Sequence, residues 1–99
     1  MAGIGRSASV VYRIELTPRA SREIDALPSE IFQSIDRAIR ELADEPRPRG
    51  AIKLRGPIYR RRAGRWRIIY AVFDRDRLVI VGKVARRAEN TYDELDRVF

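Results

Sequence analysis

The sequence predicts an α+β domain, with the element order β-α-α-β-β-β, in which a mostly antiparallel sheet carries a helical hairpin packed on one face. Three observations lead to this class: one period-two segment near the start, two segments with helical spacing after it, and three period-two segments separated by tight turns in the second half. The 99 residues suffice for one modest core. We therefore expect a single domain over residues 10–99, preceded by a poorly ordered leader over residues 1–9.

The first two elements are a strand and a short helix. Residues 10–16 read VVYRIEL, and their alternation is typical of a half-buried strand. Thr17 is a suitable N-cap and Pro18 a suitable first helical residue. We expect this helix to end at Leu27, because Pro28 disfavours helical geometry in the residue before it.

The second helix is predicted to begin with Ser29 as its cap. Apolar residues then recur at helical spacing and predict the face that covers the sheet. They are Ile31, Phe32, Ile35, Ala38, Ile39 and Leu42. Two prolines and a glycine between residues 46 and 50 end this pattern.

Three strands are predicted in the second half, over residues 58–63, 66–73 and 78–85. Turns are expected at Gly64 and between Asp74 and Asp76. In the middle strand the bulky apolar parity should face the helices, which places Arg67 on the other, open face. The pattern does not determine on which face of the sheet Arg60 and Arg62 lie.

The last strand is predicted to direct one parity into the core and the other onto the open face. The core set is Leu78, Ile80 and Val84, and the opposite set is Val79, Val81, Lys83, Ala85 and Arg87. Lys83 and Arg87 should therefore share a face with Arg67.

Positive charge is concentrated in the middle of the chain. The net charge is +7, and residues 46–73 hold nine basic side chains and no acidic one. Single exposed arginines usually only solubilise a strand and protect its edge, but a solvated face ordinarily mixes signs. A sheet face with several arginines and a nearby tyrosine suits RNA, since guanidinium groups bind phosphates and an aromatic ring stacks on an unpaired base.

The composition excludes several kinds of chemistry. There is no cysteine and no histidine, so disulfides, thiol nucleophiles and imidazole catalysis are absent, and we expect no metal and no cofactor. Asp74 and Asp76 form the one close acidic pair in the strand region, and their place favours a turn over a magnesium site. No apolar run approaches the roughly 20 residues of a membrane span, so no membrane role and a cytoplasmic location are expected.

Two segments resemble a known family, the RelE/ParE superfamily of toxins from bacterial type II toxin–antitoxin modules. KLRGPIYRRRAGRWRIIYAV, residues 53–72, resembles the central hairpin signature of that family, and VARRAENTY, residues 84–92, resembles its closing segment. Together with the early RIELTPRASREIDALP the resemblance covers roughly residues 10–92. It implies the α+β fold described above.

The RelE branch, as the resemblance implies, cuts messenger RNA in the ribosomal A site with the nucleotide's own 2′-hydroxyl as nucleophile and without a metal. Matched by motif position, Arg67 would stabilise the transition state, Arg87 would serve the leaving group and Tyr92 would stack on the substrate base. Arg60 and Arg62 occupy the two basic positions, one of which is proposed as the general base in that family. The remaining candidates for substrate binding are Lys53, Arg55, Arg65, Lys83 and Arg86, together with Arg60.

One departure from the family concerns the proton of the 2′-hydroxyl. Arg62 cannot act as a base, because a guanidinium stays protonated in proteins. Either another group accepts the proton, with Glu89 nearest in sequence, or the enzyme gives this step little help. Glu89 can equally be a surface carboxylate that neutralises Arg86 or Arg87.

Two other functions remain open at this point. The ParE branch is thought to keep the fold but to inhibit DNA gyrase without ribonuclease activity, and a basic nucleic-acid-binding module would do no chemistry at all. The partners that the resemblance implies are an acidic antitoxin that masks the arginines or displaces the C-terminal DELDRVF, the ribosome and mRNA or else gyrase, and operator DNA reached through the antitoxin.

Overall fold

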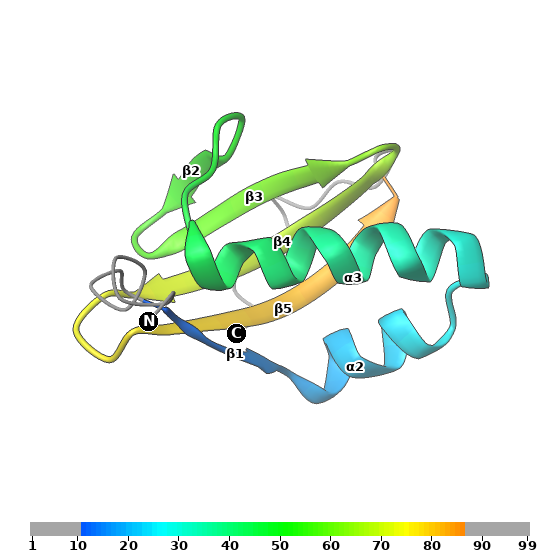
Figure 1. The fold of residues 1–99 in the computed structure, drawn as a ribbon, viewed down its shortest axis with the longest axis horizontal. Coiled ribbons are helices and arrows are strands. Elements are labelled where there is room, and N and C mark those ends of the chain that lie inside the picture. The colour runs from blue at the N-terminus through cyan, green and yellow to red at the C-terminus, as the bar shows by residue number, and fades with distance from the viewer. Residues whose placement is uncertain (1–10, 87–99) are drawn as a thin grey trace, which may run out of the picture.

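The computed structural model describes residues 11–86. Figure 1 shows one sheet with two helices on the same side of it. The elements are β1 (Arg13–Leu16), α2 (Pro18–Asp25), α3 (Ser29–Asp44), β2 (Ile52–Arg55), β3 (Ile58–Ala63), β4 (Trp66–Phe73) and β5 (Leu78–Arg86). The sheet order is β1-β5-β4-β3-β2. β1 runs parallel to β5, and the other neighbours are antiparallel.

The predicted α+β class is confirmed, and the structure adds one strand. β2 is four residues long and lies at the edge of the sheet, between the positive-φ residues Gly50 and Gly56. A segment of four residues, with only two apolar–polar repeats, carries too little periodicity to be recognised without its partner β3.

The start of α2 is as predicted. The Thr17 side chain accepts a hydrogen bond from the Ala20 N–H at 3.1 Å, and Pro18 is the first helical residue. The helix ends at Asp25, two residues earlier than expected, with Ala26 as its C-cap.

In α3 the expected cap is wrong by one position. Pro28 is the N-cap, Ser29 is already helical, and no side-chain bond caps this end. Phe32, expected in the core, is 39% exposed. The rest of the predicted stripe faces the sheet, with Ile31 partly buried and four residues buried. Those four are Ile35, Ala38, Ile39 and Leu42.

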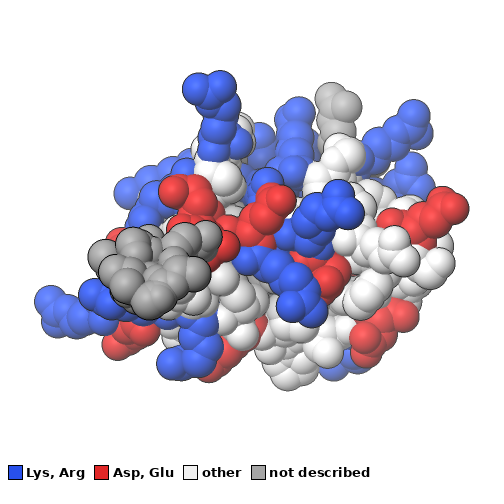
Figure 2. Space-filling model, viewed as in Figure 1, with Lys and Arg blue, Asp and Glu red and all other residues white. Residues whose placement is uncertain are grey.

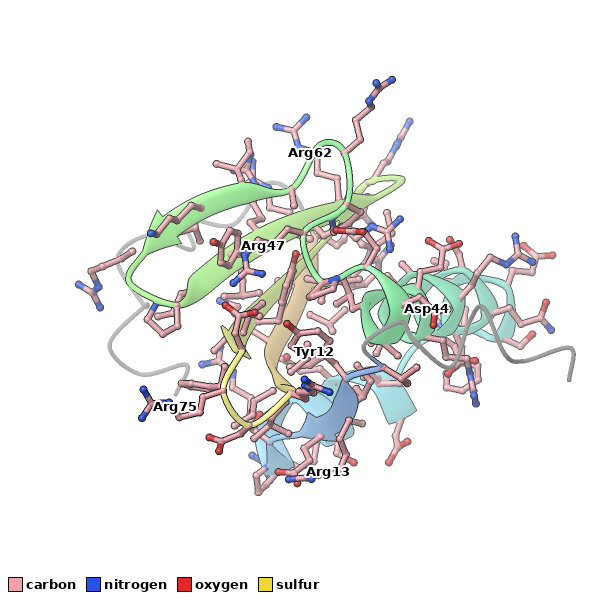
Figure 3. All side chains as sticks on the ribbon, turned by 60° about the vertical axis from the view of Figure 1, so that its left-hand side comes forward. Tyr12, Arg13, Asp44, Arg47, Arg62 and Arg75 are labelled. Atoms are coloured by element: carbon pink, nitrogen blue, oxygen red, sulfur yellow. The ribbon has the colours of Figure 1, made fainter. Side chains whose placement is uncertain are left out.

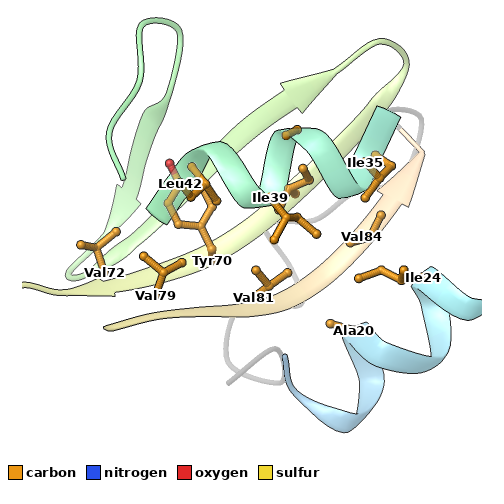
Figure 4. Close-up of a cluster of buried hydrophobic side chains, with 12 residues drawn as sticks. Ala20, Ile24, Ile35, Ile39, Leu42, Tyr70, Val72, Val79, Val81 and Val84 are labelled. Atoms are coloured by element: carbon orange, nitrogen blue, oxygen red, sulfur yellow. The ribbon is translucent and has the colours of Figure 1, made fainter. Parts of the chain in front are cut away.

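The main core lies between the helices and one face of the sheet (Figure 4). The strands contribute Ile68, Tyr70, Val72, Val79, Val81 and Val84. Burial of this apolar surface is the main force that holds the helices on the sheet. A second, small cluster lies on the opposite face and consists of Ile58, Ile69 and Ala71, with Leu54 packed against it.

The prediction for the first half of β5 is wrong. Val79 and Val81 face the helices, whereas Ile80 pairs with Ala71 and so lies on the opposite face. The register shifts between the pairs Tyr70–Val81 and Ile69–Lys83, which leaves Gly82 as an extra residue. This β-bulge inverts the alternation within the strand, so a single parity could not describe both halves.

The loop after α3 is tied to the turn between β4 and β5. Arg47 donates from both terminal nitrogens to the Asp74 carboxylate, at 3.1 and 2.7 Å, and Tyr12 donates to the same carboxylate at 2.5 Å. Figure 3 shows Arg47 and Tyr12 pointing toward this turn.

Within residues 11–86, no helix is long and apolar enough to cross a membrane.

Candidate functional site

Four cations gather on the face of the sheet that points away from the helices. Arg60 lies opposite Ile69, which lies opposite Lys83, and one row further along Arg62 lies opposite Arg67. Direct cross-strand partners project from the same side of a sheet, and Ile69 belongs to the cluster on the side away from the helices. We call Arg60, Arg62, Arg67 and Lys83 the basic face.

This arrangement confirms the predicted face of Arg67 and Lys83 and settles the face of the two remaining arginines. The tight turn at Gly64, where φ is +63°, fixes the register of the β3–β4 hairpin. That register sets Arg62 beside Arg67. The hairpin therefore joins cations that are five positions apart in the sequence.

The basic face is less open than the sequence suggested. Lys83 is 1% exposed and Arg60 is 6% exposed, and the Nε atoms of Arg60 and Arg67 are buried. Arg60, Arg67 and Lys83 also interact with other groups of the chain. Cations that are largely shielded from water and held in place act on a nearby phosphate through a lower effective dielectric than solvated ones.

Among the other predicted substrate-binding residues, Lys53 and Arg86 do not join this face. Lys53 pairs with Tyr59 and Arg86 pairs with Trp66, so both lie on the helix side of the sheet, where they are exposed. Arg55 is exposed on the edge strand β2 opposite Ile58, which belongs to the cluster away from the helices, so it lies on the same side of the sheet as the basic face, at its edge. Their roles stay predictions.

Arg65 lies in the turn between β3 and β4. Together with Trp66 and Arg86 it lines a hollow of about 400 Å³ between this turn and the start of α3. The hollow is therefore on the helix side, away from Arg67. Figure 2, which views the helix side, shows mixed charges over the helices and basic side chains along the rim formed by β2 and β3.

Arg61 has a structural role that the sequence did not reveal. Its terminal nitrogens donate to the Ala38 carbonyl at 2.7 Å and to the Glu41 carboxylate at 2.7 Å, which joins β3 to α3. Its parity, opposite to that of Arg60 and Arg62, was the available signal. Its hydrogen bond to a carbonyl of α3 joins two elements distant in the sequence, so only the folded structure reveals it.

Sequence reasoning also missed the contacts of Asp74. The hydrogen bonds from Arg47 and then from Tyr12 hold the pKa of Asp74 below its usual value. Arg47 further donates to the Tyr59 hydroxyl at 2.9 Å, and the Tyr59 ring stacks on that of Tyr70 with centroids 6.0 Å apart. Asp74 does lie in the predicted turn, and its carboxylate serves as the anchor of the α3–β2 loop.

Tyr70 completes this anchor inside the core. Its hydroxyl donates to the Pro46 carbonyl at 2.8 Å, and burial raises its pKa to about 12. Three further sequence candidates, Arg87, Glu89 and Tyr92, lie outside the described residues.

The fold and the basic face thus define an α+β domain whose helical hairpin covers one side of a five-stranded sheet and whose cations gather on the other. Residues 14–91 match the family model described as the ParE toxin of the type II toxin–antitoxin system parDE. The chain therefore belongs to this family, within the RelE/ParE superfamily.

Individual relatives agree with this assignment. The chain is 28% identical over 81 residues to "Putative toxin RelE1" of Methanocaldococcus jannaschii, a match that covers 77% of this chain and 90% of the relative. The archaeal RelE–RelB complex of Pyrococcus horikoshii contains a similar chain, with a TM-score of 0.73 and 28% identity over 81% of this chain and 99% of that one. The toxin–antitoxin complex RelBE2 of Mycobacterium tuberculosis gives 0.70 and 28%, covering 81% and 95%. The protein is thus a RelE-like toxin of a type II toxin–antitoxin system.

Proposed function

We propose that this toxin is a metal-independent endoribonuclease that cleaves mRNA on the ribosome, with the substrate's 2′-hydroxyl as nucleophile. The observation that carries the proposal is the basic face, in which four cations from three strands share one side of the sheet. Arg60, Arg62 and Arg67 also occupy the basic positions of the hairpin motif. An mRNA substrate on the ribosome implies action in the cytoplasm.

The chemistry that the described residues support is charge stabilisation. Attack of the 2′-hydroxyl on the phosphorus builds negative charge on the phosphorane oxygens, and preorganised cations lower the energy of that state. Arg62 and Arg67, as direct neighbours on β3 and β4, can both reach one phosphate with their planar forks. Lys83 adds a point charge from β5.

The remaining roles rest on the family motif. Arg87 would balance charge on the leaving 5′-oxygen, and Tyr92 would hold the base in line, which matters because positioning supplies much of the acceleration. Arg62 is unsuited to accept the 2′-hydroxyl proton, since its guanidinium stays protonated. The basic face therefore contributes charge rather than base catalysis.

Expression in cells tests this function. After induction of the wild-type chain we expect messages to be cut within codons on translating ribosomes, and we expect Arg67→Ala to abolish the cuts. Arg75→Ala is a matched control, because Arg75 is an exposed arginine in the β4–β5 turn, away from the basic face (Figure 3). Growth arrest with intact messages would overturn the nuclease proposal.

The family model favours a second candidate, since its description names a ParE toxin. In that case the chain inhibits DNA gyrase as a protein ligand and cleaves no RNA. A supercoiling assay with purified gyrase separates the two functions. Loss of supercoiling together with intact messages and a DNA-damage response supports the gyrase candidate.

Both candidate functions imply a protein partner, the antitoxin. The similar structures from P. horikoshii and M. tuberculosis are complexes of toxin and antitoxin. We propose that an acidic antitoxin binds this chain and masks the basic face, and that the complex reaches operator DNA through the antitoxin. Co-purification of an acidic protein whose binding weakens on Arg62→Glu supports this, and a stable, non-toxic lone chain contradicts it.

A further inference from the structure

The place of Lys83 depends on the bulge in β5. Val81 faces the helices, so regular alternation would direct Lys83 into the core and Val84 away from it. The extra residue Gly82 inverts this pattern, so that Val84 packs in the core and Lys83 lies opposite Ile69 on the basic face. Whatever holds the bulge therefore decides where this cation lies.

β1 cannot hold the bulge by strand pairing, because its last pair is Leu16 with Val81. The chain continues instead into the cap of α2. Thr17 donates its N–H to the Val81 carbonyl at 2.9 Å and its hydroxyl to the Gly82 carbonyl at 3.2 Å. The same hydroxyl accepts the Ala20 N–H that caps the helix. One side chain thus links the start of α2 to the bulged residue.

Glu23 holds the other side of the bulge. One oxygen of its carboxylate accepts the Val84 N–H at 2.8 Å, and the other accepts from Arg19 at 3.1 Å. A backbone N–H beyond the end of β1 would otherwise lack a strand partner, and a carboxylate is a strong acceptor for it. Thr17 and Glu23, six residues apart, therefore contact the residues on either side of Lys83.

We propose that Thr17 and Glu23 are positioning residues, which fix the bulge at Gly82 and so keep Lys83 on the basic face beside Arg67. The inference rests on the proposed nuclease function for its catalytic consequence. It predicts that the N-cap Thr17 and the α2 residue Glu23, which do not lie on the basic face, act on RNA through Lys83.

Paired variants of the full-length chain test the contacts themselves. Glu23→Gln keeps an oxygen acceptor for Val84 and Thr17→Ser keeps the hydroxyl, whereas Glu23→Ala and Thr17→Val remove them. We expect amide exchange at Val84 to become about ten- to a hundredfold faster in Glu23→Ala, the size of one lost hydrogen bond to a charged group. In the same Glu23→Ala variant we also expect the NMR signals that report side-chain contact between Lys83 and Ile69 to weaken. Glu23→Gln should retain both signals.

The functional arm uses a double-mutant cycle on mRNA cleavage. We expect Glu23→Ala to lower the rate several-fold in the wild-type background and to have no further effect once Lys83→Met is present, since Glu23 acts through Lys83. Asp36→Ala is the matched control, because Asp36 is a helix carboxylate whose ion pair with Arg40 lies on α3. Equal losses in both backgrounds, or unchanged Val84 exchange in Glu23→Ala, would overturn the inference. If the wild-type chain cleaves no message, the proposed nuclease function is contradicted. The amide-exchange and NMR measurements then still test whether Thr17 and Glu23 hold the bulge.

Discussion

Arg62 and Arg67 are direct cross-strand partners on β3 and β4, two guanidinium groups on the same side of the sheet. Like charges in this relationship destabilise an antiparallel pair. A fold selected only for stability would place an acid or a neutral residue at one of these positions. The pairing agrees with the proposed binding of an anionic substrate at the basic face.

This cost leads to a prediction in which stability and activity move in opposite directions. Arg62→Gln should raise the free energy of unfolding by about 0.2–1 kcal/mol, because it removes the like-charge pair. It should also lower mRNA cleavage. Urea unfolding measures the first effect, with Arg75→Gln as a control for the loss of one surface arginine. A destabilised Arg62→Gln chain would contradict the account.

Arg62 should contribute to the salt dependence of RNA binding, because it is exposed on the basic face. Each neutralised phosphate of a single strand adds about 0.7 to the slope of log affinity against log salt concentration. Arg62→Gln removes one exposed cation, so we expect the slope to fall by about that amount. Binding titrations at several salt concentrations check this, and Arg75→Gln should leave the slope unchanged.

Acid should weaken the anchor of the α3–β2 loop. The pKa of Asp74 is held below its ordinary value of 3.8 by Arg47 and then Tyr12. Because the folded-state pKa is the lower one, the stabilisation is present above the unfolded value and is lost as pH falls from about 5 through the folded pKa. Asp74→Asn should therefore reduce stability at neutral pH and flatten the acid limb.

Thermal unfolding between neutral pH and pH 2 measures this effect. Asp76→Asn is the control, since it changes an aspartate of the same turn and leaves the contacts of Asp74 in place. An acid limb as steep in Asp74→Asn as in the wild type would show that the anchor contributes nothing.

Removal of the buried hydroxyl of Tyr70 should cost stability. Tyr70→Phe leaves the Pro46 carbonyl without this donor, which should lower the free energy of unfolding by about 1–3 kcal/mol. The raised pKa of about 12 also means that the wild type loses stability as pH rises from 10 toward 12, because ionisation is easier in the unfolded chain. Denaturant unfolding of both chains at pH 7 and in alkali checks the two effects, and an equal alkaline loss in Tyr70→Phe would contradict the second.

Much of the fold could be read from short-range pattern. The α2 cap at Thr17, the stripe of α3 and the face of Arg67 follow from periods of 3.6 and 2, which depend on neighbours in the chain. The strand β2 and the inner and outer residues of β5 could not be read in this way. The first is too short to show a period, and the second changes its alternation at a bulge.

The candidate site, too, could be predicted from the sequence only in part. The sequence by itself determined that this is an α+β chain with a block of positive charge in its hairpin, because apolar spacing and charge are local properties. Only the tertiary structure decided which cations meet. It joined Arg60, Arg62, Arg67 and Lys83 on one face, turned Arg61 toward α3 and placed Lys53 and Arg86 on the helix side. The physical reason is that register, bulges and hydrogen bonds between distant segments set the direction of a side chain, and these contacts form only when the strands pair.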